Sequence, residues 1–185
     1  MRLATGKLNL LVYIVSTLTL LVFVFYLIPK FGIYPFQEHI KLLDLRFWYT
    51  PIDVFHLFSQ LGVNGRDVYR FFTIFIDMLY PLVYGFWFYL SLTFLLKKLF
   101  LNNSKFQSLR FIPFGIVLSD YIENLNILYL LNTFPQISEV IVIIGAIASF
   151  SKWIFTILTI LILIIATFIV CAKYISRFKI KTFKN

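Results

Sequence analysis

The chain has 185 residues, of which 61% are hydrophobic, and its formal net charge is +9. Soluble domains contain about 45–50% apolar residues, and the excess here lies in long runs, which is typical of membrane-spanning helices and excludes an ordinary soluble domain. The basic residues flank these runs, so the charge indicates membrane topology and contact with anionic headgroups, and we expect no nucleic-acid partner.

The first apolar run covers residues 9–28. Its twenty residues are long enough to cross the hydrocarbon core as a helix. The run is too long for the apolar part of a signal peptide, and no small-residue cleavage pattern follows it. We therefore expect a retained first helix that Pro29 ends.

A long segment of mixed charge, residues 30–70, follows the first run. Within it, Thr50 suits an N-cap, Pro51 suits the first helical position and Gly62 suits a left-handed helix end. Asn64-Gly65 is a turn signal. We expect a structured cap that rests on the helix ends or the membrane surface through aromatic side chains: Trp48, Tyr49, Phe55 and Phe58.

Two further spans are predicted at 71–96 and 111–131. The last apolar stretch, 140–172, is too long for one perpendicular crossing. It is either a short outer helix followed by a span over 153–172, or one long helix that projects from the membrane. The sequence thus predicts an all-α integral membrane protein, a single domain over 1–185 with a bundle of about four transmembrane helices.

The orientation follows from the distribution of Lys and Arg. The N-terminus, the 97–110 loop and the C-terminal tail are basic and nearly free of acids, whereas the 30–70 segment mixes both signs. The positive-inside rule places both termini in the cytoplasm and makes the cap extracytoplasmic. We expect a multi-pass protein of the cell membrane.

Three acidic residues interrupt the apolar runs: Asp77 in the second, and Asp120 and Glu123 in the third. A charge at the centre of a span costs at least about 2.5–3.5 kcal/mol on insertion scales, so these acids are expected to face the bundle interior and to mark function. Asp120, Glu123 and Asn124 stand at i, i+3 and i+4, on one helical face. Antiparallel packing would bring the acids together in the outer half of the bilayer, with Lys152 as their counter-ion.

Polar residues of the second span extend this candidate site. Tyr80 and Tyr84 share a helical face with Asp77 and Arg70. The tyrosines would line the site, and Arg70 or Lys152 would stabilise an anion.

Pro81 lies four residues after Asp77 and cannot donate to its carbonyl. We expect a kink that leaves this carbonyl without its usual backbone partner. Irregular backbone at membrane depth is tolerated where it is buried in protein or lines a wet cavity.

A weaker constellation lies just before the second span, and its members are His56, Arg66, Asp67 and Arg70. A lone His on a short helix is more often a packed or surface residue than a functional one, although it titrates near neutral pH. Most such charges are solvated or locally paired. If the arginines turn inward over the bundle mouth, they would bind an anionic headgroup.

The first functional hypothesis is acid/base chemistry on a lipid or another hydrophobic ligand. Closely spaced buried carboxyls do not all ionise, so one can donate a proton while another accepts it. Asp77, Asp120 and Glu123 would handle protons and Asn124 would orient the substrate. In a variant of this hypothesis the same oxygens hold a divalent cation. One cysteine and two histidines form no Cys/His metal cluster, and no motif indicates a cofactor.

Two other hypotheses remain open. In one, the chain is a non-enzymatic accessory or scaffold subunit whose polar residues hold helices together, and Gly145, Ala146 and Ala148 form a contact with a partner helix or in a homo-oligomer. In the other it is a proton or ion pathway, although the polar residues thin out below Asp120.

The layout as a whole resembles the sterol-isomerase and sigma-2-type membrane fold: four spans, a structured segment after the first, and acids in the second and third. The local sequences DMLYP and SDYIEN around the acids are not assigned to that fold. The resemblance is one of layout, and it assigns no residue a role.

Overall fold

The computed structural model describes residues 2–36, 40–100 and 104–182, and every regular element in these ranges is a helix. Four helical segments are long and apolar enough to cross a membrane, which is the pattern of a multi-pass membrane protein. They confirm the number of apolar helices that the sequence predicts, and they cover Leu10–Ile33, Pro51–Leu99, Lys105–Thr133 and Glu139–Ser176.

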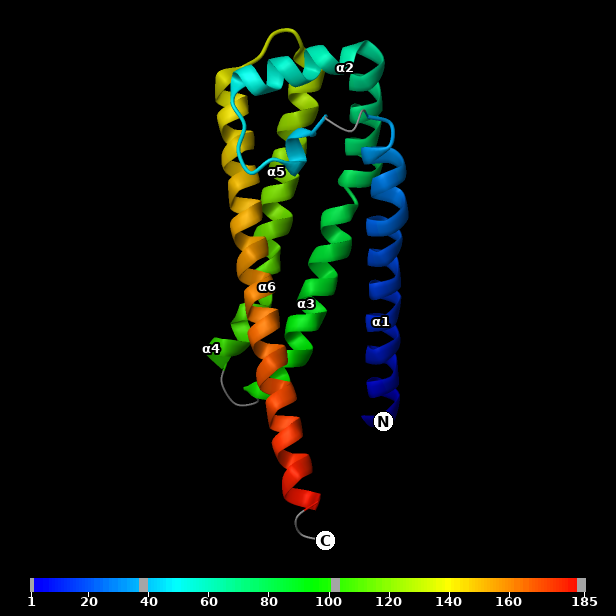
Figure 1. Cartoon of the computed structure of the whole chain (residues 1–185), viewed down its shortest axis with the longest axis vertical. Helices are drawn as coiled ribbons and strands as arrows, with labels where there is room; N and C mark the ends of the chain where they lie inside the picture. The colour runs from blue at the N-terminus through cyan, green and yellow to red at the C-terminus, as the bar shows by residue number, and fades with distance from the viewer. Residues whose placement is uncertain (1, 37–39, 101–103, 183–185) are drawn as a thin grey trace.

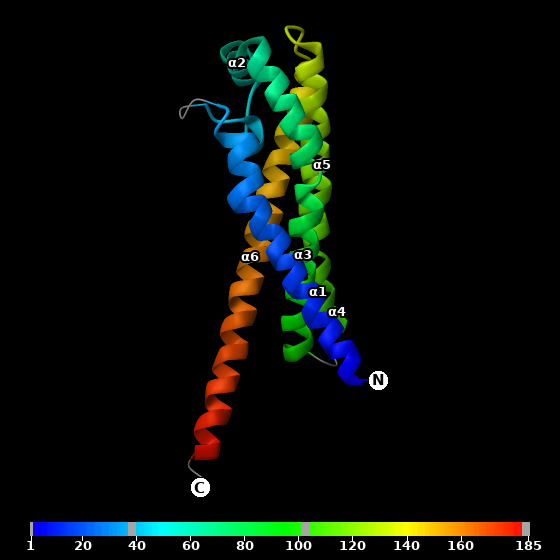
Figure 2. The ribbon, with the colours of Figure 1, turned by 90° about the vertical axis from the view of Figure 1, so that its right-hand side faces the viewer.

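The helices form an elongated bundle (Figure 1). α5 (Pro113–Thr133) and α6 (Glu139–Thr182) pack side by side, α3 (Tyr80–Leu99) packs against both of them, and α1 (Arg2–Val22) packs against α3. Both chain ends and the short α4 (Ser104–Gln107) lie at one end of the bundle (Figures 1 and 2). The first half of α2 (Pro51–Phe72) lies across the opposite end, which we call the capped end.

The first helix does not end at Pro29, contrary to the sequence-based prediction. Two π-helical turns, η1 (Phe23–Leu27) and η2 (Pro29–Ile33), continue it to residue 33. Proline is tolerated at the start of a helical turn because its missing N–H has no partner to lose there. The turn then closes by a 2.8 Å hydrogen bond from the Tyr34 N–H to the Pro29 carbonyl.

α2 begins as predicted. The Thr50 hydroxyl accepts from the Asp53 N–H, the Asp53 carboxylate accepts from the Thr50 N–H at 2.8 Å, and Pro51 follows the cap. Gly62 interrupts the helix with a φ of 62°. The Arg66 guanidinium donates to the Phe58 carbonyl at 2.8 Å and so satisfies a carbonyl next to the break.

The chain then resumes as a helix directly after Gly62. The turn expected at Asn64-Gly65 is therefore wrong, since both residues lie inside α2. The second of the four long apolar segments includes the end of α2, a π-helical turn, η4 (Thr73–Asp77), and α3.

The last apolar stretch is one continuous helix, which decides between the two alternatives. α6 has 44 residues and is roughly 66 Å long at 1.5 Å per residue, against a hydrocarbon core of about 30 Å. Its C-terminal part leaves the other helices and projects from the bundle (Figure 2). Ser149 does not interrupt it, because its hydroxyl donates to the Arg46 carbonyl at 2.6 Å.

The main apolar core lies at the capped end, where α2 and the segment before it cover α5 and α6. Its largest fully buried side chains include Tyr49, Phe58 and Tyr69. Elsewhere many large apolar side chains are exposed, as expected of surfaces that face lipid. The small residues Gly145 and Ala146 are buried inside the bundle, so they do not offer the partner contact that the scaffold hypothesis expected of them.

Candidate functional site

The predicted counter-ion lies between two of the predicted acids. The Lys152 Nζ of α6 is 2.6 Å from Glu123 Oε2 and 3.2 Å from Asp120 Oδ1, both on α5. The exposed fractions are 8% for Lys152, 4% for Asp120 and 0% for Glu123. Ion pairs desolvated to this extent are costly to form and very costly to break, because a lone buried charge remains.

α3 contributes the tyrosines that the sequence places on the face of Asp77. The Tyr84 hydroxyl donates to Asp120 Oδ2 at 2.6 Å. Tyr80 lies one turn earlier, with its ring centroid 4.8 Å from that of Tyr84. Asp120 thus receives an ammonium on one oxygen and a phenol on the other, and both oxygens are satisfied.

Asp77 closes the site on the side of the broken helix. Asn124 Nδ2 donates to the Asp77 backbone carbonyl at 3.1 Å, and the Tyr121 hydroxyl donates to the Met78 carbonyl at 2.9 Å. These are carbonyls that the irregular turn before Pro81 leaves exposed, and two side chains of α5 take the place of the missing backbone donors. The backbone irregularity expected at this depth is therefore present.

The Asp77 carboxyl has a different environment from its backbone. Only 6% of the residue is exposed, and Oδ2 is buried without a hydrogen-bond partner. Glu123 Oε1 and Asn124 Oδ1 are also buried acceptors without a partner. Native structures contain few such groups, and here three of them lie close together in η4 and α5.

Asp44 joins the cluster from the segment that precedes α2, in the short turn η3 (Leu43–Leu45). Its backbone carbonyl accepts from Lys152 Nζ at 3.1 Å, and its carboxyl accepts from the Tyr69 hydroxyl at 3.0 Å. Burial raises the pKa of the Asp44 carboxyl, against the lowering effects of the Lys152 charge and the Tyr69 hydrogen bond.

Asp44 was not predicted as a site residue, because it is one of several charges in the mixed segment 30–70. A local signal was present, because Asp44 is the only charge in the apolar tetrapeptide LLDL. Leu42 and Leu43 are 2% and 0% exposed, whereas Leu45 is 43% exposed, so only the first part of this turn is inserted into the bundle.

A cavity of about 440 Å³ lies next to this cluster. Its polar part is formed by six residues with carboxyl, amine or phenol groups: Asp44, Asp77, Tyr80, Tyr84, Asp120 and Lys152. Its apolar part is formed by α1 and η1 on one side and by α6 on the other, through Leu20, Val24, Trp153 and others. An amphiphilic molecule with a small polar group and an apolar body matches such a lining.

Three residues of the predicted set lie outside the cluster. Arg70 pairs with Asp67 at 2.6 Å and donates to the Leu131 carbonyl at 3.1 Å. Arg66 caps the Phe58 carbonyl and lies over the Phe134 ring, and His56 is exposed on α2. None of the three lines the cavity.

The metal variant of the hypothesis fits this geometry poorly. The ammonium of Lys152 stands between the Asp120 and Glu123 carboxylates, where a cation bridging them would have to lie. Within the described ranges, no three His, Cys, Asp or Glu side chains are grouped so that they would hold a metal ion.

No protein-family model, curated protein or solved structure matches this chain. The resemblance to the sterol-isomerase and sigma-2-type fold therefore remains one of layout. The function has to be argued from the site itself.

Proposed function

We propose that this chain is a multi-pass protein of the cell membrane, with both termini in the cytoplasm, that acts by acid/base chemistry on a lipid or another hydrophobic substrate. The observation that carries the proposal is the 440 Å³ cavity, in which Asp77, Asp120 and Lys152 form part of a polar side that faces an apolar side. Ionisable groups at membrane depth are expensive and by default mark function.

The roles follow from the contacts. Asp77 has a buried oxygen without a donor and lines the cavity, so it is the group that accepts a proton or a hydrogen bond from the substrate. Asp120 and Tyr84 share one hydrogen bond and both line the cavity, so they form the second proton-handling pair. Lys152 holds Asp120 in place and balances its charge, and Glu123 positions the Lys152 ammonium.

Deuterium exchange tests the chemistry without knowledge of the substrate. The purified protein is reconstituted in nanodiscs with total membrane lipids, incubated in D₂O, and the lipids are analysed by mass spectrometry. Proton transfer at carbon leaves deuterium in one lipid class with the wild type, and Asp77→Asn loses this incorporation. Equal spectra for wild type, Asp77→Asn and Asp120→Asn would reject proton transfer at carbon in membrane lipids.

The orientation is tested by cysteine accessibility, since Cys171 is the only cysteine. In a Cys171→Ser background, Gln60→Cys reports on the exposed surface of α2, and Ser176→Cys reports on the opposite end of the bundle. A membrane-impermeant maleimide should label Gln60→Cys in intact cells, and Ser176→Cys only after permeabilisation. The reverse pattern would invert the topology and place the site in the inner half.

A scaffold function is the second candidate, because the contacts in the cluster connect different helices. Tyr84–Asp120 joins α3 to α5, Lys152–Glu123 joins α6 to α5, and Asn124 joins α5 to η4. Such contacts stabilise helix association in lipid by about 0.6 kcal/mol each. This function requires no cavity, and it predicts that every one of these side chains stabilises the fold.

A further inference from the structure

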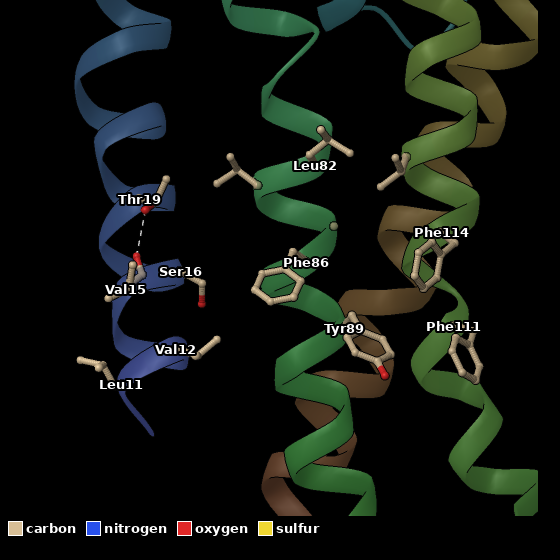
Figure 3. Close-up of a pocket in the computed structure, with 13 residues that line it drawn as sticks. Leu11, Val12, Val15, Ser16, Thr19, Leu82, Phe86, Tyr89, Phe111 and Phe114 are labelled. Atoms are coloured by element: carbon tan, nitrogen blue, oxygen red, sulfur yellow. Dashed lines mark hydrogen bonds between the residues drawn. The ribbon is translucent and has the colours of Figure 1, made fainter. Parts of the chain in front are cut away.

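A second groove lies between α1, α3 and α5, and it is separate from the acidic cluster. Its volume is about 910 Å³, and its walls include Val12, Val15, Leu82, Phe86, Phe111 and Phe114 (Figure 3). Leu11, Tyr89 and Phe111 lie toward the end of the bundle that carries the termini, whereas Thr19 and Leu82 lie toward the capped end.

Few polar side chains line this groove. Their hydroxyl groups either donate to a carbonyl of their own helix or point toward one end of the bundle. Ser16 donates to the Tyr13 carbonyl at 2.9 Å, and Thr19 donates to the Val15 carbonyl at 2.9 Å. The Tyr89 hydroxyl points toward the end of the bundle with the termini (Figure 3). The groove walls are therefore almost entirely apolar, and they fit a hydrocarbon chain.

A positive charge stands where the groove meets that end. The Arg110 guanidinium carbon is 4.9 Å from the ring centroid of Phe111, which lines the groove, and its Nε is buried without a hydrogen-bond partner. Among the described residues, no carboxylate lies within ion-pair distance of Arg110, and the sequence contains no acid between Asp77 and Asp120. Further basic residues of this region are Lys97, Lys98 and Lys105.

We propose that the groove binds an anionic phospholipid, with one acyl chain between α1 and α5 and the phosphate on Arg110. Arginine presents a planar fork of donors that matches phosphate oxygens, and it keeps its charge at any physiological pH. Arg110 has no carboxylate partner among the described residues, and the surrounding lysines add to the field that favours an anionic headgroup over a zwitterionic one. The acyl chain of the lipid gains apolar contact along the groove walls, where the Ser16 and Thr19 hydroxyls already donate within α1.

The test is lipid retention by the full-length protein, measured by native mass spectrometry after equilibration with equal amounts of phosphatidylglycerol and phosphatidylcholine. Arg110→Gln removes the phosphate ligand, and Lys173→Gln removes a charge from an exposed site on the projecting part of α6. Leu82→Trp fills the groove and keeps every charge. Leu125→Trp, an equally large change at another exposed apolar position, is its control.

The wild type should retain phosphatidylglycerol over phosphatidylcholine, and Arg110→Gln should reduce this retention at least about fivefold, while Lys173→Gln leaves it unchanged. Leu82→Trp should also lose the lipid, and Leu125→Trp should keep it. Equal losses for Arg110→Gln and Lys173→Gln would overturn the proposal, because the effect would then be general surface attraction. Equal retention of the two lipids by the wild type, or full retention by Leu82→Trp, would overturn it as well.

Discussion

The ammonium of Lys152 lies 2.6 Å from the carboxylate of Glu123, whose side chain is completely buried. The pair connects α6 to α5, and the same ammonium reaches Asp120 and the backbone carbonyl of Asp44. One ammonium thus connects two helices and the segment before α2, and three acceptor groups lose this contact when it is removed.

Lys152→Met should therefore destabilise the protein by about 3–5 kcal/mol, because it leaves two buried carboxylates without a counter-charge. The free energy of unfolding in detergent measures the effect. Lys173→Met changes an exposed lysine of the same helix and should stay within about 0.5 kcal/mol of the wild type. In the double variant with Glu123→Gln, the loss should be smaller than the sum of the two single losses, since one charge of the pair no longer needs a partner.

Asp77 and Glu123 should respond in opposite ways to loss of charge. Asp77 has a buried oxygen without a partner, so Asp77→Asn should melt at or above the wild-type temperature, as is common for groups kept for function at a cost in stability. Glu123→Gln weakens the contact with Lys152 and should lose about 1–3 kcal/mol. If Asp77→Asn melts as far below the wild type as Glu123→Gln, Asp77 is a structural partner, and the scaffold function gains the support that the acid/base function loses.

Much of the fold follows from local patterns in the sequence. The apolar runs predict the four long helices because a span needs about twenty apolar residues. The start of α2 was predictable because Thr50, Pro51 and Asp53 act within one turn. Asp120 and Glu123 were predicted on one face from their spacing, and Lys152 was predicted at their depth from the length of the last apolar stretch.

The parts that were not predictable depend on long-range contacts or on the helical register. Asp44 enters the cluster because the segment before α2 is held by Ser149, whose hydroxyl bonds to a carbonyl 103 residues earlier in the chain. Arg70 was expected beside Asp77 from the α-helical period. The π-helical turn η4 between them adds a residue to the turn and rotates Arg70 away, toward Asp67 and the end of α5.

Pro81 and Asn124 should be energetically coupled through the Asp77 carbonyl. Asn124→Ala removes the donor to this buried carbonyl and should cost about 1–3 kcal/mol. Pro81→Ala supplies a backbone N–H that can bond to the same carbonyl, four residues earlier. In the Pro81→Ala background, Asn124→Ala should therefore cost at least about 1 kcal/mol less, as measured by a double-mutant cycle of unfolding free energies. Additive losses would mean that Asn124 does not replace the missing backbone donor.

Asp44 should make stability depend on pH in the opposite sense to an ion-paired surface carboxylate. Burial raises the pKa of its carboxyl in the folded protein, so its contribution is fully present below the ordinary carboxyl range and is lost as the pH rises through the raised pKa. Asp44→Asn keeps an oxygen for the Tyr69 hydroxyl and removes the ionisation, so it should flatten this part of the stability profile and be at least as stable as the wild type at neutral pH.

Asp44→Ala also removes the ionisation but leaves the buried Tyr69 hydroxyl without its acceptor, and it should be less stable than Asp44→Asn at every pH. The measurement is the unfolding free energy of the three proteins between pH 4 and pH 8, about the range over which a carboxyl with a raised pKa titrates. If the stability of the wild type rises across this range relative to Asp44→Asn, Asp44 is stabilised as the anion and the prediction is wrong.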